Sequence, residues 1–187
     1  KIINVDGTGI EWIVHSVGDD SDPTWSPDGR YIAFTSTRIG DSRQVYVIDA
    51  VCLEEPEGCT SIIPTGVSCH PDFCAVEYSP EWAPLDITTP SWLPGSHNLA
   101  VVVSINTAPA KIFLRPPADV IPIDFNRNDQ VVGVDHVAWS PDGSMFAFTW
   151  YVNRGVNEIF VTPLQDRGVT WTRLTESNGN REPCFSP

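Results

Sequence analysis

The sequence has few basic residues and lacks a long apolar run. Lys and Arg number 11 against 24 Asp and Glu, which gives a formal net charge of −13. Nucleic acids and anionic membrane surfaces attract basic proteins, so this acidity argues against both as partners and favours a cation or a basic protein surface. No stretch of about 18 apolar residues occurs, so no transmembrane helix is expected.

Familiar catalytic motifs are also missing. The sequence contains no Gly-x-Ser-x-Gly nucleophile elbow, no His-Glu-x-x-His metalloprotease motif and no glycine-rich phosphate loop. The histidines are scattered along the chain, which favours separate surface or turn positions: His15, His70, His97 and His136. We therefore expect a protein without enzymatic activity.

Cysteine is the one residue type that bears on the compartment. Four of the five cysteines form two close pairs, Cys52 with Cys59 and Cys69 with Cys74, and neither pair has the Cys-x-x-Cys spacing of a metal site. We interpret them as two small disulfide loops, which persist in a periplasm or outside a cell. Two pairs of free thiols are the alternative. The fifth, Cys184, stays reduced or finds a partner elsewhere, and an export signal would have been removed before Lys1 or lie outside this sequence.

The sequence contains a repeat. Residues 25–35, WSPDGRYIAFT, return as WSPDGSMFAFT at residues 139–149, with eight identities in eleven positions. A weaker copy around Trp92 keeps the Trp, Pro and Ala in register but has Gly-Ser in place of Asp-Gly, and another copy begins at residues 183–187. Sequence self-similarity at a period of about 20–50 residues is typical of solenoids and propellers.

The repeat spacing predicts a β-propeller. The aromatic anchors Trp25, Trp92, Trp139 and Phe185 are 67, 47 and 46 residues apart, and an apolar strand lies 21 residues after each of the first three anchors, at Tyr46, Phe113 and Phe160. Pro-Asp-Gly has the composition of a tight turn between two strands. The fold class is therefore all-β, with about four blades of four-stranded antiparallel sheet.

These repeats resemble the propeller repeats of the TolB family, whose periplasmic members carry a Trp-Ser-Pro-Asp-Gly turn like residues 25–29 and 139–143. The resemblance covers most of the chain and departs from the family pattern around Trp92 and in the Cys-rich segment. It implies a propeller with an exported location and protein partners. It implies no catalytic residues, because the shared motif is structural.

The repeat also divides the chain. We expect blades at about residues 1–18 (partial), 22–66, 89–129 and 135–177, a further blade beginning at 183–187, and a Cys-rich insertion at 67–89. The terminal blade is then split between the two ends of the chain. Either the strand near Phe185 completes the N-terminal blade, within one molecule or between molecules in a filament, or the sequence is a piece of a longer protein.

One acidic loop has the spacing of a calcium site. Oxygen-bearing side chains occupy positions 1, 3, 5 and 12 of a twelve-residue loop, and a backbone carbonyl would serve position 7: Asp124, Asn126, Asn128, Asp135 and, through its carbonyl, Gln130. Position 6, which is Gly in an EF-hand loop, is Asp129. An ordinary connection between two blades, rich in turn-forming Asn and Asp, is the alternative interpretation.

Two further surfaces are candidates for binding. The acidic connection before Trp25 would lie on one rim of the propeller and attract a cation or a basic partner through Asp19, Asp20 and Asp22. The insertion carries aromatic side chains, which dominate protein interfaces: Phe73, Tyr78 and Trp82. A lid packed over a blade edge is the alternative role for this insertion.

Together these features favour a non-enzymatic exported propeller that binds a protein or assembles with copies of itself. An accessory propeller that gates an exported serine peptidase of the prolyl oligopeptidase type is the first alternative. A carbohydrate-active propeller with converging histidine, arginine and carboxylate side chains is the second. No cofactor is expected except the calcium considered above.

Overall fold

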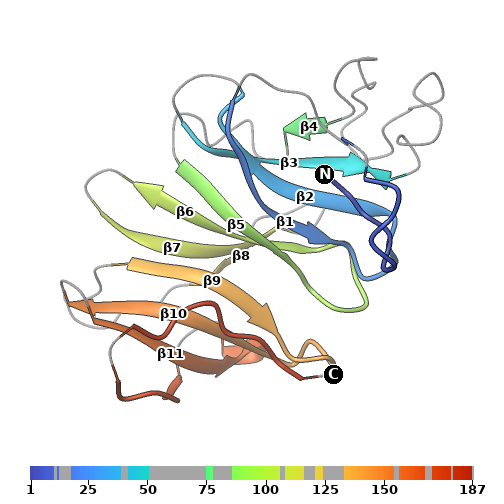
Figure 1. Ribbon diagram of the computed structural model, residues 1–187. Coiled ribbons are helices and arrows are strands. Elements are labelled where there is room, and N and C mark those ends of the chain that lie inside the picture. Colours follow the sequence, from blue (N-terminus) through green and yellow to red (C-terminus); the bar gives the residue numbers. More distant parts are fainter. Residues whose placement is uncertain are drawn as a thin grey trace.

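The computed structural model describes residues 1–10, 12, 18–38, 42–50, 75–77, 86–105, 108–115, 121–123, 133–153, 156–166, 170–177 and 179–186. Within these ranges the chain forms three four-stranded antiparallel sheets and one short 3₁₀ helix, η4 (Leu164–Asp166). In Figure 1 the sheets lie one beside the next, with β1, β5 and β9 as the first strand of each. The all-β blade architecture predicted from the repeat is confirmed.

Each sheet is a blade whose strands follow one another in chain order. Blade 1 consists of β1 (Asp20–Trp25), β2 (Tyr31–Ser36), β3 (Gln44–Asp49) and β4 (Ala75–Glu77). Blade 2 consists of β5 (Asp86–Trp92), β6 (Leu99–Ile105), β7 (Ala108–Arg115) and β8 (Ile121–Ile123). Blade 3 consists of β9 (Gly133–Trp139), β10 (Met145–Asn153), β11 (Val156–Pro163) and β12 (Thr172–Arg173). No helix among these residues is long and apolar enough to cross a bilayer.

The Ser-Pro-Asp-Gly turn joins the first two strands of blades 1 and 3 through its own side chains. The Ser26 hydroxyl donates to the Asp28 carboxylate at 2.6 Å and accepts from the backbone N–H of Tyr31 at 2.8 Å. Gly29 has a φ of 73°, a left-handed conformation that a glycine adopts without strain. The same bonds recur in blade 3 from Ser140 to Asp142 at 2.6 Å, so the repeated letters encode a repeated hydrogen-bond network.

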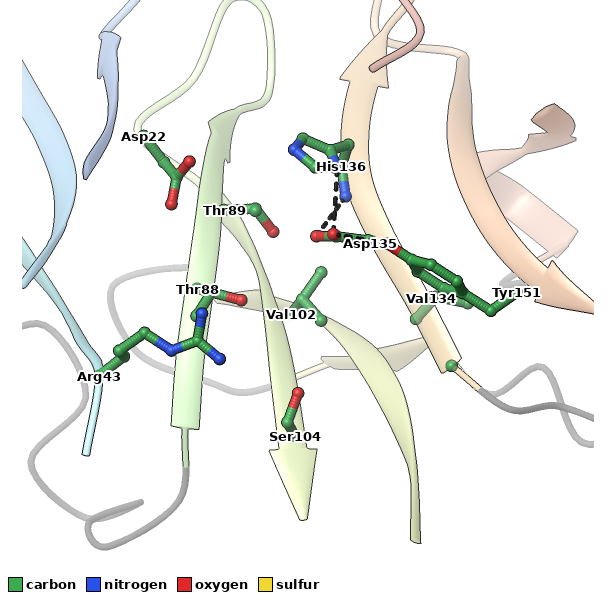
Figure 2. Close-up of a pocket in the computed structure, with 11 residues that line it drawn as sticks. Asp22, Arg43, Thr88, Thr89, Val102, Ser104, Val134, Asp135, His136 and Tyr151 are labelled. Carbon is green, nitrogen blue, oxygen red and sulfur yellow. Dashed lines mark hydrogen bonds and ion pairs between the residues drawn. The ribbon is translucent and has the colours of Figure 1, made fainter. Parts of the chain in front are cut away.

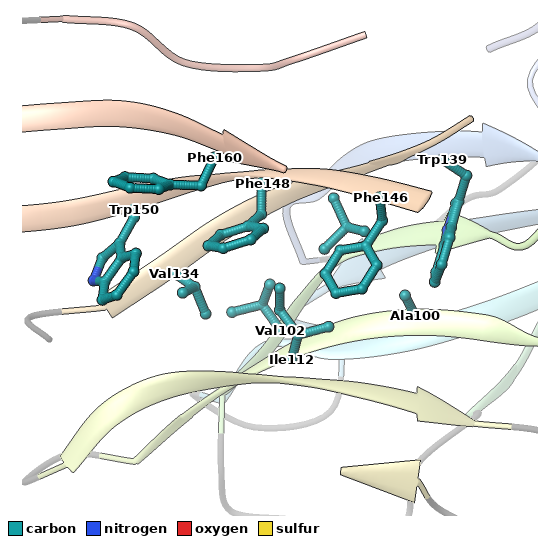
Figure 3. Packing of buried hydrophobic residues seen from close by; sticks show 10 residues of the cluster. Ala100, Val102, Ile112, Val134, Trp139, Phe146, Phe148, Trp150 and Phe160 are labelled. Carbon is teal, nitrogen blue, oxygen red and sulfur yellow. The ribbon is translucent and has the colours of Figure 1, made fainter. Parts of the chain in front are cut away.

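Apolar side chains fill the space between neighbouring blades. In β6, alternate residues face opposite ways: Leu99, Val101 and Val103 join a cluster with blade 1, whereas Ala100 and Val102 join a cluster with blade 3. Figure 3 shows Phe146, Phe148, Trp150 and Phe160 of blade 3 packed over Ala100, Val102 and Ile112. The middle blade is therefore covered on both faces, as expected for propeller sheets that pack face to face.

The aromatic anchors connect each blade to the one before it. The indole N–H of Trp92 donates to the carbonyl of Thr24 at 3.2 Å, and that of Trp139 donates to the carbonyl of Ser91 at 3.3 Å. Each acceptor is the residue directly before the preceding anchor. Trp92 and Trp139 are 7% and 8% exposed, whereas Trp25 is 50% exposed. The repeated tryptophan thus forms a contact between neighbouring blades at Trp92 and Trp139, whereas the Trp25 side chain is half exposed.

Three predicted details differ from the structure. β1 begins at Asp20, so Asp20 and Asp22 lie on a strand instead of in the connecting loop that we expected. β4 lies inside the segment 67–89, so part of the expected insertion supplies the outer strand of blade 1 by pairing with β3. The strand that we expected near Phe185 is not formed, because residues 181–186 have no regular secondary structure.

Candidate functional site

A left-handed residue recurs three positions before every aromatic anchor. Four residues other than glycine have a positive φ in the described part of the chain, and all four occupy this position: Asp22 at 51°, Thr89 at 48°, His136 at 45° and Glu182 at 54°. The regularity extends to the C-terminal copy, because Glu182 precedes Phe185 by the same three residues. We call these four residues the left-handed set.

A β-bulge accounts for the conformation in each first strand. The pairing register shifts between Ser21 and Thr24 in β1 and between Thr88 and Ser91 in β5, and opposite His136 in β9. A bulge inserts an extra residue and redirects its side chain, and such bulges are frequent next to functional sites. A left-handed conformation costs a residue with a Cβ roughly 1–2 kcal/mol. Glycine would avoid this cost, yet it occurs at none of the four positions.

A cavity of about 390 Å³ opens beside the left-handed residues of the three first strands. Figure 2 shows Asp22 and Arg43 on one side of it, Asp135, His136 and Tyr151 on the other, and two threonines of β5 between them. We call it the first-strand cavity; it is lined by Asp22, Arg43, Thr88, Thr89, Val102, Ser104, Gly133, Val134, Asp135, His136 and Tyr151. Most of this lining is polar.

His136 and Asp135 form a linked pair on β9. The imidazole Nδ1 lies 3.1 Å from the Asp135 carboxylate, which also accepts from the Tyr151 hydroxyl at 3.2 Å. The contact of the imidazole with the Asp135 carboxylate raises the pKa of His136 against the opposing effect of burial, and the charges of Glu182 and Asp22 add to the increase. Burial opposes ionisation of Asp135, but the bonds from His136 and Tyr151 lower its pKa overall. The pair therefore favours an imidazolium next to a carboxylate.

The other side of the cavity carries the carboxylate of Asp22 and the guanidinium of Arg43, which is paired with Asp86. Arg43 donates from Nη2 to the Asp86 carboxylate at 3.2 Å and from its backbone N–H to the same carboxylate at 2.8 Å. Asp22 accepts from the neighbouring Ser21 hydroxyl at 3.0 Å. The hydroxyl oxygen of Thr89 is buried and has no hydrogen-bond partner within the described residues. Asp22 thus leaves acceptor capacity at the cavity, and the buried Thr89 hydroxyl is an unused acceptor in a lining residue.

A second polar cluster at the blade turns resembles a catalytic group only in composition. The Asp28 carboxylate accepts from the Ser26 hydroxyl at 2.6 Å and contacts His97 Nε2 at 2.8 Å. The carboxylate therefore separates the serine from the histidine, and His97 is not placed to take a proton from Ser26. The Ser26 bond, followed by the His97 bond, lowers the pKa of Asp28. This cluster holds the turns of blades 1 and 2 together.

The structure places some of the predicted site residues and not others. Asp20 pairs with Arg38 at 3.0 Å, and the backbone of Asp19 bonds to Thr37, so these two stabilise blade 1. Asp22 and Asp135 meet at the first-strand cavity. Cys184 is an exposed free cysteine. The remaining predicted ligands, contact aromatics and cysteines lie outside the described residues: Asp124, Asn126, Asn128, Gln130, Phe73, Tyr78, Trp82, Cys52, Cys59, Cys69 and Cys74.

The calcium prediction stays a prediction. Of its five residues only Asp135 lies in the described ranges, where His136 and Tyr151 bond to its carboxylate. Within the same ranges no group of three His, Cys, Asp or Glu side chains is arranged to hold a metal ion.

Sequence reasoning missed most of the cavity lining. Thr89 and His136 carry no motif, Arg43 directly precedes β3, and Tyr151 lies within β10. The missed signal was the column three residues before each anchor, which holds Asp, Thr, His and Glu and never an apolar residue. An alignment of the repeats on their anchors displays this column, although the left-handed geometry requires the structure.

Comparisons with known proteins agree with the architecture. The chain superimposes on TolB from Acinetobacter baumannii with a TM-score of 0.62 and 19% identity, over 93% of this chain and 36% of that one. It superimposes on a putative TolB from Agrobacterium tumefaciens with a TM-score of 0.59 and 18% identity, over 90% and 50% of the two chains. A prolyl endopeptidase structure matches with a TM-score of 0.52 and 14% identity, over 86% and 22%.

One curated sequence is also similar. The uncharacterized peptidase YuxL of Bacillus subtilis is 31% identical over 99 residues, which is 53% of this chain and 12% of that protein. No protein-family model matches the chain. The chain thus spans half or less of the length of each of these proteins. The similarity of its blades to the two TolB structures identifies the chain as having the TolB-type β-propeller fold.

Proposed function

We propose that this chain is a non-enzymatic, exported propeller segment that binds a protein partner at the first-strand cavity. The observation that carries the proposal is the left-handed set: four polar side chains held at one repeat position by a strained backbone. Strain of this kind persists where the surrounding structure enforces it, and it gathers at binding and active sites. Three of the four line the cavity between neighbouring blades.

The rest of the cavity suits recognition better than catalysis. The carboxylate of Asp135 is held by His136 and Tyr151, and Arg43 is held by Asp86. His136 and Arg43 are thus each paired with a carboxylate. General base catalysis would also need a group to deprotonate within hydrogen-bond reach of the base. The acidity of the whole chain favours a partner with a basic surface, because opposite charge accelerates association. The resemblance to TolB-type propellers supports a protein as that partner and an exported location.

A second candidate function is the propeller segment of a peptidase. The 31% identity to YuxL and the match to a prolyl endopeptidase favour it. In that arrangement the cavity would contact another domain of the same polypeptide. Self-association, through the C-terminal residues 183–186 or through the cavity, is the third arrangement to test.

Site-directed photo-crosslinking separates these candidates. A benzoylphenylalanine replaces Ser104, which lines the cavity, in the full-length protein in its own cells, and a control probe replaces the exposed Glu176. The proposal predicts one discrete adduct with a different polypeptide from position 104 and none from 176. An adduct within the same polypeptide would support the peptidase arrangement, and an adduct of two copies would support self-association. The absence of any adduct specific to position 104 would contradict binding at the cavity.

A further inference from the structure

The first-strand cavity has acceptors that lack a full set of hydrogen-bond donors among the described residues. Asp22 is a carboxylate whose described contact is the hydroxyl of the adjacent Ser21 at 3.0 Å. The nearby Thr89 hydroxyl oxygen is buried without a hydrogen-bond partner among the described residues. Figure 2 shows both side chains reaching into the cavity from β1 and β5. A ligand that satisfies them has to donate hydrogen bonds.

The charges around the cavity favour a positive ligand. His136 lies 3.1 Å from the Asp135 carboxylate and 3.9 Å from that of Glu182, so its imidazole is shared between two acids. The Arg43 guanidinium is matched by Asp86. None of the described ion pairs includes Asp22, whose charge acts on His136 only from a longer distance. An anionic ligand would meet these carboxylates at close range, and like charges at such distances repel.

We propose that the first-strand cavity accepts the cationic end of a lysine or arginine side chain from the protein partner. Its ammonium or guanidinium group contacts the Asp22 carboxylate, and rotation of the Thr89 side chain brings the buried hydroxyl toward the same group. This inference rests on the proposed function and names the chemistry of the group that is bound. The cavity volume of about 390 Å³ is at the lower end of the range for ligand pockets, which suits one side chain better than a large cofactor.

The left-handed set explains how the fold supplies this chemistry. A bulge directs one side chain per blade toward the cavity, so the residue at that position decides what the blade contributes. Blade 1 contributes a carboxylate, blade 2 a hydroxyl and blade 3 an imidazole already bound to acids. Within the described residues no three His, Cys, Asp or Glu side chains are arranged to hold a metal ion, whereas an ammonium group can be bound by a single carboxylate and a nearby hydroxyl.

The test uses short peptides and the full-length protein. The peptide acetyl-Gly-Lys-Gly-amide is titrated against isotope-labelled protein, and the backbone N–H of Thr89 and the His136 imidazole are followed by NMR. The matched control peptide carries Nε-acetyl-lysine, which keeps the length of the side chain and removes its charge. Asp22→Asn removes the proposed anion, and Glu176→Gln makes the same change in net charge at an exposed site outside the cavity. Asp22→Gly is a second variant that suits a φ of 51°.

We expect saturable shifts with the lysine peptide and none with the acetylated peptide. Asp22→Asn and Asp22→Gly should each weaken binding about fivefold to tenfold, and Glu176→Gln by less than about twofold. Equal weakening by Asp22→Asn and Glu176→Gln would show attraction by net charge alone and overturn the inference. Shifts caused by calcium chloride but by neither peptide would show a metal site and overturn it as well.

The two proposals fail separately. If the probe at Ser104 captures a partner but the lysine peptide does not bind, protein binding stands and the cationic ligand is wrong. If the peptide binds at Asp22 but position 104 captures no protein, the cationic site stands and the proposed function is wrong.

Discussion

The difference in unfolding free energy between a glycine and an alanine variant should have opposite signs at Asp22 and at its neighbour Ser21. Asp22 has a φ of 51°, whereas Ser21 is not among the positive-φ residues of the same strand. At Ser21 an ordinary strand conformation makes glycine less stable than alanine by roughly 0.5–1 kcal/mol, because glycine loses more backbone entropy on folding. At Asp22 the same loss of backbone entropy still disfavours glycine, but alanine carries a left-handed strain of roughly 1–2 kcal/mol that glycine avoids. Asp22→Gly should therefore be more stable than Asp22→Ala by about 0.5–1 kcal/mol.

The comparison cancels other effects, since both variants at each position lose the same side chain. Urea unfolding followed by circular dichroism gives the free energies, and thermal unfolding should separate the variants by about 2–4 °C per kcal/mol. Repeating the pair at His136 tests whether the property belongs to the repeat position. The reasoning would be refuted if alanine were more stable than glycine at both Asp22 and Ser21.

Three further results are expected. Trp139→Phe should lower the unfolding free energy by about 1–2 kcal/mol, because it removes a hydrogen bond and buried area. Trp25→Phe, at the exposed anchor, should change it by less than about 0.5 kcal/mol. Equal losses in urea titrations would contradict the contact between blades. The Ser140 hydroxyl lowers the pKa of Asp142 to about 2, so the contribution of this carboxylate to stability is present above a pH of about 3.8 and is lost as the pH falls toward 2. Asp142→Asn should reduce this acid sensitivity, which urea unfolding midpoints across that pH range would measure. In NMR titrations His136 should lose its proton above its usual pKa of 6.5, and Asp135→Asn should lower that midpoint; an unchanged midpoint would contradict the pairing.

The fold could be predicted because its determinants are local and repeated. The Pro-Asp-Gly turn, the period-2 apolar strands and the constant offset from Trp25 to Tyr46 are all present in contiguous sequence. Blade boundaries were less accurate, since β4 pairs with β3 from a distant part of the chain. Which strand joins a sheet after a long connection depends on tertiary pairing, and no local pattern specifies it.

The candidate site was only partly predictable for a different reason. Asp22 and Asp135 stood out as acids, but their convergence depends on how one blade packs on the next. His136 was expected at a surface or turn and instead lies in a bulge of β9. The bulge arises from a register shift between strands, which has no signature in composition or charge.

The alternation of β6 between two clusters has a consequence for folding. Because Leu99 and Val101 pack against blade 1 and Ala100 and Val102 pack against blade 3, both faces of β6 in blade 2 are apolar and buried. Removing either neighbouring blade would expose a full apolar sheet surface, so a single blade should not be a cooperative folding unit. The three blades should instead melt together, and the amides of β6 should exchange with solvent last, through global unfolding.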